Sequence, residues 1–221
     1  MTLKSKKLKI WLLLTCLIAI NTHQAIAKKA APQRMTETNI QPFLPLLDDL
    51  AQRFPKKYAS DKPLIIISAS EQRLYLIRNN QVQASHLIST GEAGMGNFSG
   101  SNKTPLGVHQ VAEKFGKGAK FGTIFKSRMN TRKVAQILTK SGERSKADNV
   151  TSRILWLSGL EKGINKGGKV DSHARYIYIH GTDEEGRLGK PASHGCIRMK
   201  NQAVINLFEQ VPVGTLVDII D

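Results

Sequence analysis

Cysteine is scarce in this chain. The 221 residues contain two cysteines, Cys16 and Cys196, and the first lies in an N-terminal segment that we expect to be removed. Cys196 would then be the only cysteine of the mature protein, so no intramolecular disulfide could form. Zinc-finger spacings, a glycine-rich phosphate loop after a strand and internal repeats are absent as well. The length allows one ordinary hydrophobic core, with room for a short lead segment.

Long apolar runs are also lacking, and the one strongly apolar run lies near the start. It extends from Ile10 to Ile20, follows four lysines and precedes the small-x-small triplet at 25–27. Such a run is too short to span a bilayer comfortably, and the order predicts an export signal over 1–27. An uncleaved anchor and a lipoprotein signal at Cys16 are the alternatives. We therefore expect a protein of the periplasm or cell envelope that contacts the membrane only through this segment.

Acidic side chains are few compared with basic ones. The sequence has 17 aspartates and glutamates against 33 lysines and arginines, which gives a net charge of +16. Removal of the signal, which holds four lysines and no acid, would leave +12. An exported protein seldom meets nucleic acid, so nucleic acid is not an expected partner. A solvated basic surface, anionic wall polymer and acidic lipid head groups all remain compatible with this charge.

The hydrophobic pattern predicts a mainly β domain from residue 61 to 221. Residues 28–60 are predicted to be a flexible lead that ends in a short helix, because apolar residues between 40 and 54 recur at spacings of three and four. After residue 63 the pattern favours strands, and one late helix is expected at 201–211. The predicted strands are 64–67, 73–78, 81–90, 104–111, 154–157, 175–180 and 215–220. We expect a β-sandwich with little helical decoration.

The segment 113–150 interrupts this pattern. It is basic, contains four glycines and shows little periodicity, apart from one or two possible helical turns at 132–138. A basic segment of this length within a compact domain is typical of a lid or binding loop. A disordered insertion is the alternative.

The chemistry concentrates around Cys196 and two histidines. His194 lies two residues before Cys196, whereas His180 ends the predicted strand 175–180 on the face opposite Ile177 and Ile179. A thiol beside an imidazole predicts nucleophilic catalysis, and either histidine could be the base. A buried inert cysteine is the simplest alternative, and a metal site made by His180, His194 and Cys196 is a second.

Three features near Cys196 favour its thiolate, which is the nucleophilic form. A histidine can take the proton. Arg198 and Lys200 add positive potential, and the helix expected to begin near Asn201 directs the positive end of its dipole toward the same turn. The sequence therefore predicts a thiol shifted toward its anion.

These residues resemble the L,D-transpeptidases of bacterial cell-wall synthesis, the YkuD-domain family. The similarity rests on His180-Gly181-Thr182 followed by Ser193-His194-Gly195-Cys196-Ile197-Arg198-Met199, and it covers about residues 61–221. The resemblance implies a β-sandwich-like catalytic domain with Cys196 as nucleophile and His180 as proton acceptor and donor. It also implies that a set of neighbours shapes the site: Gly181, Ser193, His194, Gly195 and Arg198.

The resemblance also implies a substrate class. Members of the family act on peptidoglycan stem peptides through a cysteine thioester and need no metal or organic cofactor. Transfer to a second stem peptide makes a cross-link, and transfer to a lysine of a lipoprotein attaches that protein to the wall. Transfer to water makes the enzyme an L,D-carboxypeptidase. The sequence contains no separate wall-binding repeat, which many relatives carry, and this departure leaves the acceptor open. A non-catalytic murein-binding protein is a further alternative.

Overall fold

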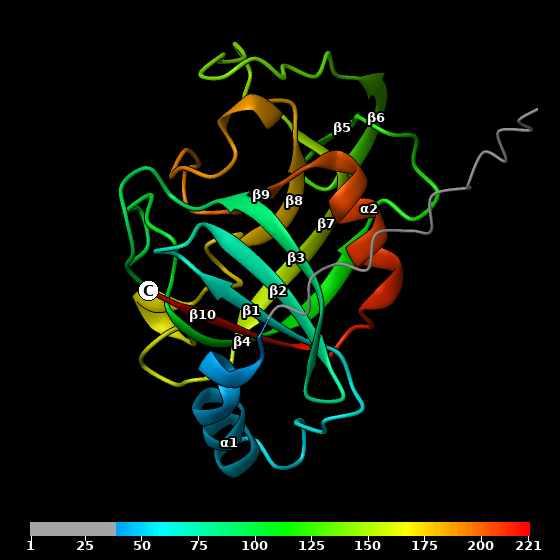
Figure 1. Ribbon diagram of the computed structural model, residues 1–221. Helices are drawn as coiled ribbons and strands as arrows, with labels where there is room; N and C mark the ends of the chain where they lie inside the picture. Colours follow the sequence, from blue (N-terminus) through cyan, green and yellow to red (C-terminus); the bar gives the residue numbers. More distant parts are fainter. Residues whose placement is uncertain (1–38) are drawn as a thin grey trace, which may run out of the picture. The chain divides into compact units, whose positions relative to one another are not determined.

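The structure is a computed structural model that describes residues 39–221 (Figure 1). The predicted export signal at 1–27, Cys16 and the first part of the predicted flexible lead lie outside the described residues. No helix in the described part of the chain is long and apolar enough to cross a membrane.

Ten strands form one sheet, and hydrogen bonds close most of it into a ring. The order runs β4-β10-β1-β2-β3-β9-β8-β7, and a further pairing of β4 with β7 completes the circle. The hairpin of β5 and β6 continues from β7 beyond the ring. The strands are β1 (Leu64–Ser68), β2 (Arg73–Arg78), β3 (Gln81–Ser89), β4 (Gly107–Phe115), β5 (Thr123–Lys126), β6 (Met129–Val134), β7 (Val150–Gly159), β8 (Tyr178–Thr182), β9 (Ile197–Met199) and β10 (Leu216–Ile220).

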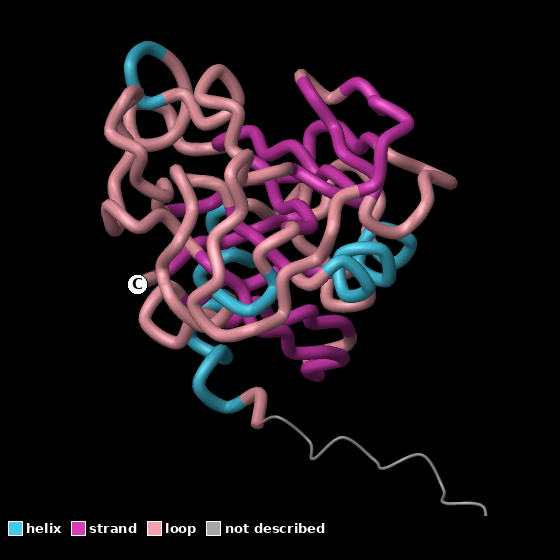
Figure 2. Tube along the Cα trace, turned by 90° about the horizontal axis from the view of Figure 1, so that it is seen from above, coloured by secondary structure: helices cyan, strands magenta, loops and turns pink. Residues whose placement is uncertain are grey.

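The interior of the ring holds the main core. Side chains alternate between the two faces of a strand, so Ile65 and Ile67 of β1 point inward and meet Leu155 and Leu157 of β7 in one buried cluster. Figure 2 shows strands crossing the middle of the domain and hairpins reaching its edge, with long loops gathered to one side. The predicted mainly β fold is confirmed, and the double pairing of β4 makes it a closed sheet.

Two helices cover the sheet. Helix α1 (Leu44–Arg53), preceded by a 3-10 turn at Gln41–Phe43, packs Leu47 and Leu50 against the outer face of β1. Helix α2 (Asn201–Gln210) buries its apolar stripe, which includes Leu207 and Phe208, in the ring core. Both helices were expected from their spacing of apolar residues. Two further 3-10 turns, at Gly168–Val170 and Glu185–Arg187, lie in loops.

Several boundaries differ from the prediction for local reasons. The strand expected at 104–111 begins at Gly107 and continues to Phe115. The strand expected at 175–180 begins at Tyr178, because Tyr176 has a positive φ of 57° that breaks extended backbone. Within 113–150 the hairpin β5–β6 is present, and the helical turns considered at 132–138 are wrong. Strand β6 occupies that segment up to Val134, and its backbone pairs with β5.

Candidate active site

Two neighbouring parallel strands bring Cys196 and His180 to the same face of the sheet. In the register of β8 and β9, Ile179 lies beside Ile197 and His180 beside Arg198. Ile179 and Ile197 point into the ring core, so His180 and the residue before Ile197 point outward. Continuing the register by one residue places Cys196 beside Tyr178, two positions from His180. The thiol and the imidazole are therefore diagonal neighbours on adjacent strands.

His180 is held as a neutral imidazole with one free nitrogen. Its Nδ1 donates a hydrogen bond to the carbonyl oxygen of Gly181 at 2.7 Å, because a carbonyl can only accept. Burial lowers the pKa of His180 to about 4, and the nearby guanidinium of Arg198 contributes. Within residues 39–221, Nε2 has no hydrogen-bond partner. This tautomer leaves the Nε2 lone pair available to accept a proton.

The Cys196 thiol is neutral as well, contrary to the expected shift toward thiolate. Burial raises the pKa of Cys196 to about 11, although the backbone of Tyr178 and the guanidinium groups of Arg198 and Arg175 act in the opposite direction. The residue is only half-buried, and its Sγ–H donates to the carbonyl oxygen of Tyr176 at 3.3 Å. The positive groups foreseen from the sequence are present, but desolvation outweighs them.

The turn before Cys196 is locked by hydrogen bonds around Ser193. The buried Ser193 hydroxyl donates to the carbonyl oxygen of Cys196 at 2.5 Å and accepts from the Gly195 N–H at 3.0 Å. The carbonyl oxygen of Gly195 accepts from Thr104 Oγ1 at 3.0 Å. Gly195 has a φ of 115°, where a side chain would be strained, and a Cβ there would lie 3.0 Å from the Lys103 carbonyl oxygen. Glycine is therefore required at this position.

Arg198 is buried beside His180 and is neutralised by two carboxylates. Its guanidinium contacts Asp148 at 2.5 Å and Glu184 at 2.8 Å. Asp148 also accepts a hydrogen bond from Nδ1 of His194 at 3.0 Å. The His194 side chain is 76% exposed, so it lies at the surface of the turn, while His180 is the buried histidine beside the thiol.

Gly181 permits a close contact behind the site. A Cβ at Gly181 would lie 2.7 Å from Asn201 Oδ1 and from the Thr151 carbonyl oxygen. The Asn201 amide donates to the Thr182 carbonyl oxygen at 2.7 Å and to Glu185 Oε1 at 2.8 Å. The N-cap position is Lys200, and Asn201 joins the start of α2 to β8.

Comparison with known proteins shows which family this chain belongs to. The family model for the L,D-transpeptidase catalytic domain (YkuD) matches residues 62–219. The chain belongs to the L,D-transpeptidase family. YqjB of Bacillus subtilis (strain 168), assigned to the same family, is 30% identical over 159 residues, which are 72% of each chain. YbiS of Escherichia coli (strain K12) is 49% identical over 47 residues, 21% of this chain and 15% of its own.

Solved structures of the family are also similar to this chain. One of L,D-transpeptidase 3 from Mycobacterium tuberculosis has a TM-score of 0.45 at 15% identity and covers 72% of this chain and 61% of its own. The chain thus spans less than two thirds of that structure.

Further residues line this L,D-transpeptidase site, and two of them, Trp156 and Arg128, were not expected there from the sequence. An aromatic wall, formed by Trp156, Tyr176 and Tyr178, lies beside Cys196. The Arg128 guanidinium, from the turn between β5 and β6, lies 4.6 Å from the Trp156 ring centroid and 5.3 Å from that of Tyr176. It also donates to the Tyr178 hydroxyl at 3.2 Å. The basic hairpin is thereby attached to the edge of the site.

A second arginine fixes the opposite side of the turn. The Arg175 guanidinium donates to the carbonyl oxygens of Asn97 at 2.8 Å and Lys103 at 2.6 Å. Its charge lowers the pKa of Cys196, so it lies close to the thiol. Arg175, Asp148 and Glu184 come from loops without a motif, and only their distance in space from Cys196 marks them as site residues.

The metal-site alternative finds no support in the donor set. In the described range 39–221, no three His, Cys, Asp or Glu side chains lie together as potential metal ligands. His180 Nδ1 is engaged by Gly181, and His194 is exposed and bound to Asp148. His180, His194 and Cys196 therefore do not converge on one point.

Proposed function

We propose that this protein is an exported L,D-transpeptidase that acts on peptidoglycan stem peptides through a thioester on Cys196. The observation that carries the proposal is the placement of Cys196 and His180 on one face of adjacent strands. His180 presents an unprotonated Nε2 on that face, since Nδ1 holds the proton. A nucleophile and a base so placed form the minimal unit for acyl transfer.

The first half of the reaction follows from these groups. Sγ of Cys196 attacks the carbonyl carbon between the L-centre of the third stem residue and the D-residue after it. His180 Nε2 accepts the thiol proton and then delivers it to the leaving amine as the C–N bond breaks. The products are a thioester on Cys196 and the free D-residue, and His180 returns to its neutral form.

The second half uses an amine in place of the released residue. The incoming amine attacks the thioester carbonyl and gives its proton to His180, and the C–S bond breaks with return of the proton to Cys196. An amine of another stem peptide yields a cross-link, and a lysine of a wall-anchored lipoprotein yields a protein attached to the wall. Water in the same role would make the enzyme an L,D-carboxypeptidase.

The neutral resting pair fits a reaction in which proton transfer accompanies attack. A thiol with a pKa of about 11 and an imidazole with a pKa of about 4 do not exchange a proton at rest. As negative charge develops on the substrate oxygen and the proton reaches His180, Arg175 and Arg198 supply positive charge nearby. Preformed charge of this kind stabilises the transition state more than the resting state.

Ser193, Gly195 and Gly181 are proposed to shape the site. Ser193 and Gly195 form the hydrogen-bonded turn that orients Cys196, and Gly181 allows the approach of Asn201 behind His180. His194 would support the turn through Asp148. Export is proposed on the pattern of residues 1–27 alone.

Product analysis with Cys196→Ala tests the proposal. Wild-type protein incubated with disaccharide-tetrapeptide should release the terminal D-residue and form dimers, whereas Cys196→Ala should form neither. Ser60→Ala is the matched control and should retain product, because Ser60 is exposed and lies outside the site. Unchanged product with Cys196→Ala contradicts the nucleophile assignment. Release without dimers indicates a carboxypeptidase, and binding of murein with no product from the wild type indicates a non-catalytic role.

A further inference from the structure

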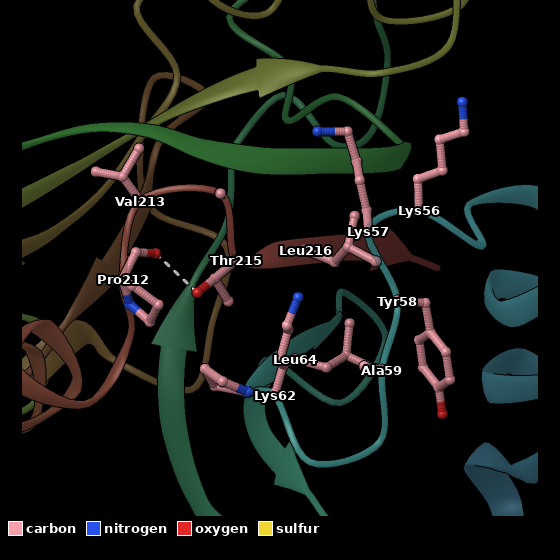
Figure 3. A pocket seen from close by; sticks show the side chains of 12 residues that line it. Lys56, Lys57, Tyr58, Ala59, Lys62, Leu64, Pro212, Val213, Thr215 and Leu216 are labelled. Carbon is pink, nitrogen blue, oxygen red and sulfur yellow. Dashed lines mark hydrogen bonds between the residues drawn. The ribbon is translucent and has the colours of Figure 1, made fainter.

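A cavity of about 310 Å³ lies between the segment after α1 and the turn that precedes β10. Residues 56–64 form one side and residues 212–216 the other (Figure 3). A cavity of this size falls at the small end of the range for sites that bind small molecules. None of the residues discussed for the reaction lines it.

The cavity lies at the opposite rim of the sheet from Cys196. It adjoins Leu64 and Leu216, the first residues of the parallel strands β1 and β10. Cys196 immediately precedes β9. Strand β9 runs antiparallel to β3, which has the same direction as β1 because each is antiparallel to β2. The starts of β1 and β9 therefore lie at opposite rims.

Three lysines and no acidic residue line this cavity. Lys56, Lys57 and Lys62 are all exposed. Figure 3 shows Lys62 extending between the two walls of the cavity, whereas the Lys56 ammonium group points away from them. Lys57 Nζ donates to Gln110 Oε1 at 2.7 Å. In the part of the chain that the structure describes, none of the three forms a salt bridge. Their positive charges are thus available to an anionic ligand.

The floor of the cavity is apolar. Leu64 and Leu216 are buried beneath it, and Val213 is 59% exposed at its edge. The Thr215 hydroxyl donates to the Pro212 carbonyl oxygen at 2.8 Å, so it offers a ligand only acceptor capacity. Cationic groups around an apolar floor suit a ligand that joins an anionic group to an apolar part.

We propose that this cavity binds a phosphate head group, either presented on a lipid surface or free in solution. A phosphate carries more charge than a carboxylate and spreads it over several oxygens, so it can accept from ammonium groups on different sides of the cavity. A protein bound to a surface through this rim would direct Cys196 away from that surface. The inference rests on the cavity and stands apart from the reaction at Cys196.

Binding to vesicles and to inorganic phosphate tests the proposal. The test variant is the triple substitution Lys56→Gln, Lys57→Gln and Lys62→Gln. The matched control is Lys162→Gln, Lys166→Gln and Lys169→Gln, which removes the same charge from exposed lysines at the other rim. Both are made in the mature full chain, and equal unfolding midpoints establish that each variant is folded. Vesicles of phosphatidylglycerol with phosphatidylcholine, and of phosphatidylcholine alone, are the lipid probes.

The expected result distinguishes binding at the cavity from attraction by the net positive charge of the protein. At physiological salt the cavity variant should bind anionic vesicles about 100-fold more weakly, since each lysine near an anionic surface contributes roughly a factor of five. The control variant should lose less than about fivefold, because its charges lie at the opposite rim and salt screens their effect on the cavity. In NMR spectra, inorganic phosphate should shift amides of 56–64 and 212–216 in the wild type and in the control only. Equal losses in the two variants, or no response of these amides together with no vesicle binding, would overturn the proposal.

A third variant identifies the source of the phosphate. Val213→Ser should weaken vesicle binding and leave the response to inorganic phosphate unchanged if a lipid is the ligand, because only a lipid extends onto the apolar edge. Amide shifts with inorganic phosphate but no vesicle binding by the wild type would assign the site to free phosphate. Either pattern supports a phosphate site at this rim.

Discussion

Two buried histidines of this chain share a lowered pKa and a contact of Nδ1 with a backbone carbonyl oxygen, but they differ in the partner of Nε2. His109 on β4 and His180 on β8 are both inaccessible to solvent, and burial lowers the pKa of each to about 4. In each, Nδ1 contacts a backbone carbonyl oxygen, that of Gly107 at 2.8 Å or Gly181 at 2.7 Å. Nε2 of His109 lies 2.9 Å from Ser172 Oγ, whereas Nε2 of His180 is unpaired within 39–221 and lies on the face of Cys196.

The comparison shows that burial and a low pKa do not by themselves mark a catalytic histidine. Both imidazoles are neutral, and in both Nδ1 faces a backbone carbonyl oxygen. Ser172 satisfies His109 and makes it part of the structure. The role proposed for His180 depends on the thiol beside it, whose proton Nε2 would accept. The group near Nε2 is therefore the difference between the two histidines.

The largest expected effect comes from substituting His180 and His109 separately and comparing the two variants. His180→Gln should lower the turnover of a stem tetrapeptide about 10³-fold, a typical loss for a general acid–base group. It should also lower the free energy of unfolding, because the buried bond to Gly181 is lost. His109→Gln should leave turnover within a few-fold of the wild type and lower the free energy of unfolding by about 2 kcal/mol, because its buried contacts are lost. Steady-state kinetics and urea denaturation measure both quantities. Equal turnover losses would contradict the distinction between the two histidines.

The next effect concerns the resting thiol. Because the pKa of Cys196 is raised to about 11, its alkylation by iodoacetamide should be slow at pH 7 and should increase about tenfold per pH unit up to pH 10. His180→Gln should leave this profile almost unchanged, since burial rather than the imidazole sets the thiol pKa. Fast alkylation at pH 6–7 that depends on His180 would instead indicate a resting thiolate–imidazolium pair.

A smaller effect is expected in acid. Between pH 6.5 and 4 the unfolded chain binds protons at His109 and His180 that the folded chain does not, so stability decreases as the pH falls, by about 1.4 kcal/mol per unit for each histidine. Asp218 opposes this. Burial raises its pKa to about 6, so the folded chain binds its proton first. Urea denaturation between pH 4.5 and 6.5 should show a steeper loss in Asp218→Asn and a shallower one in His109→Gln, and equal slopes would contradict these assignments.

The smallest effect is expected in the β5–β6 hairpin, which lies beside the site of Cys196 and His180. Arg128→Ala removes the cation–π contacts with Trp156 and Tyr176. Amide hydrogen exchange in β5 and β6 should become faster. Lys126→Ala in the same hairpin is the control and should leave exchange unchanged, because Lys126 is exposed. Equal protection in both variants would show that Arg128 does not hold the hairpin.

Much of the fold could be predicted because its strands carry clear patterns. Strand β1 is a continuous apolar run, and α2 has a helical stripe, so both were found. Hairpin β5–β6 was missed because β6 is mostly exposed and polar, and its order comes from backbone pairing that leaves no periodicity. The turn at Tyr176 was missed because only its positive φ, and no side-chain pattern, ends the strand.

Part of the site was also predictable, because two of its residues lie in clear sequence patterns. Cys196 and His180 lie in a distinctive sequence block, and the register of β8 and β9 brings them together. The protonation state of Cys196 was not predictable, because desolvation depends on how the surrounding chain packs. Arg175 and Glu184 flank β8, and Asp148 lies in the loop before β7. Their contacts depend on loop conformation, which no motif reports.

Mass measurement of the acyl-enzyme tests the central assignment most directly. The wild-type protein, incubated with a disaccharide-tetrapeptide in the absence of an acceptor and quenched in acid, should gain the mass of the acyl fragment on the peptide that contains Cys196. Cys196→Ala should gain none, and His180→Gln should gain it far more slowly. An adduct on another residue, or an equal adduct in Cys196→Ala, would contradict the account.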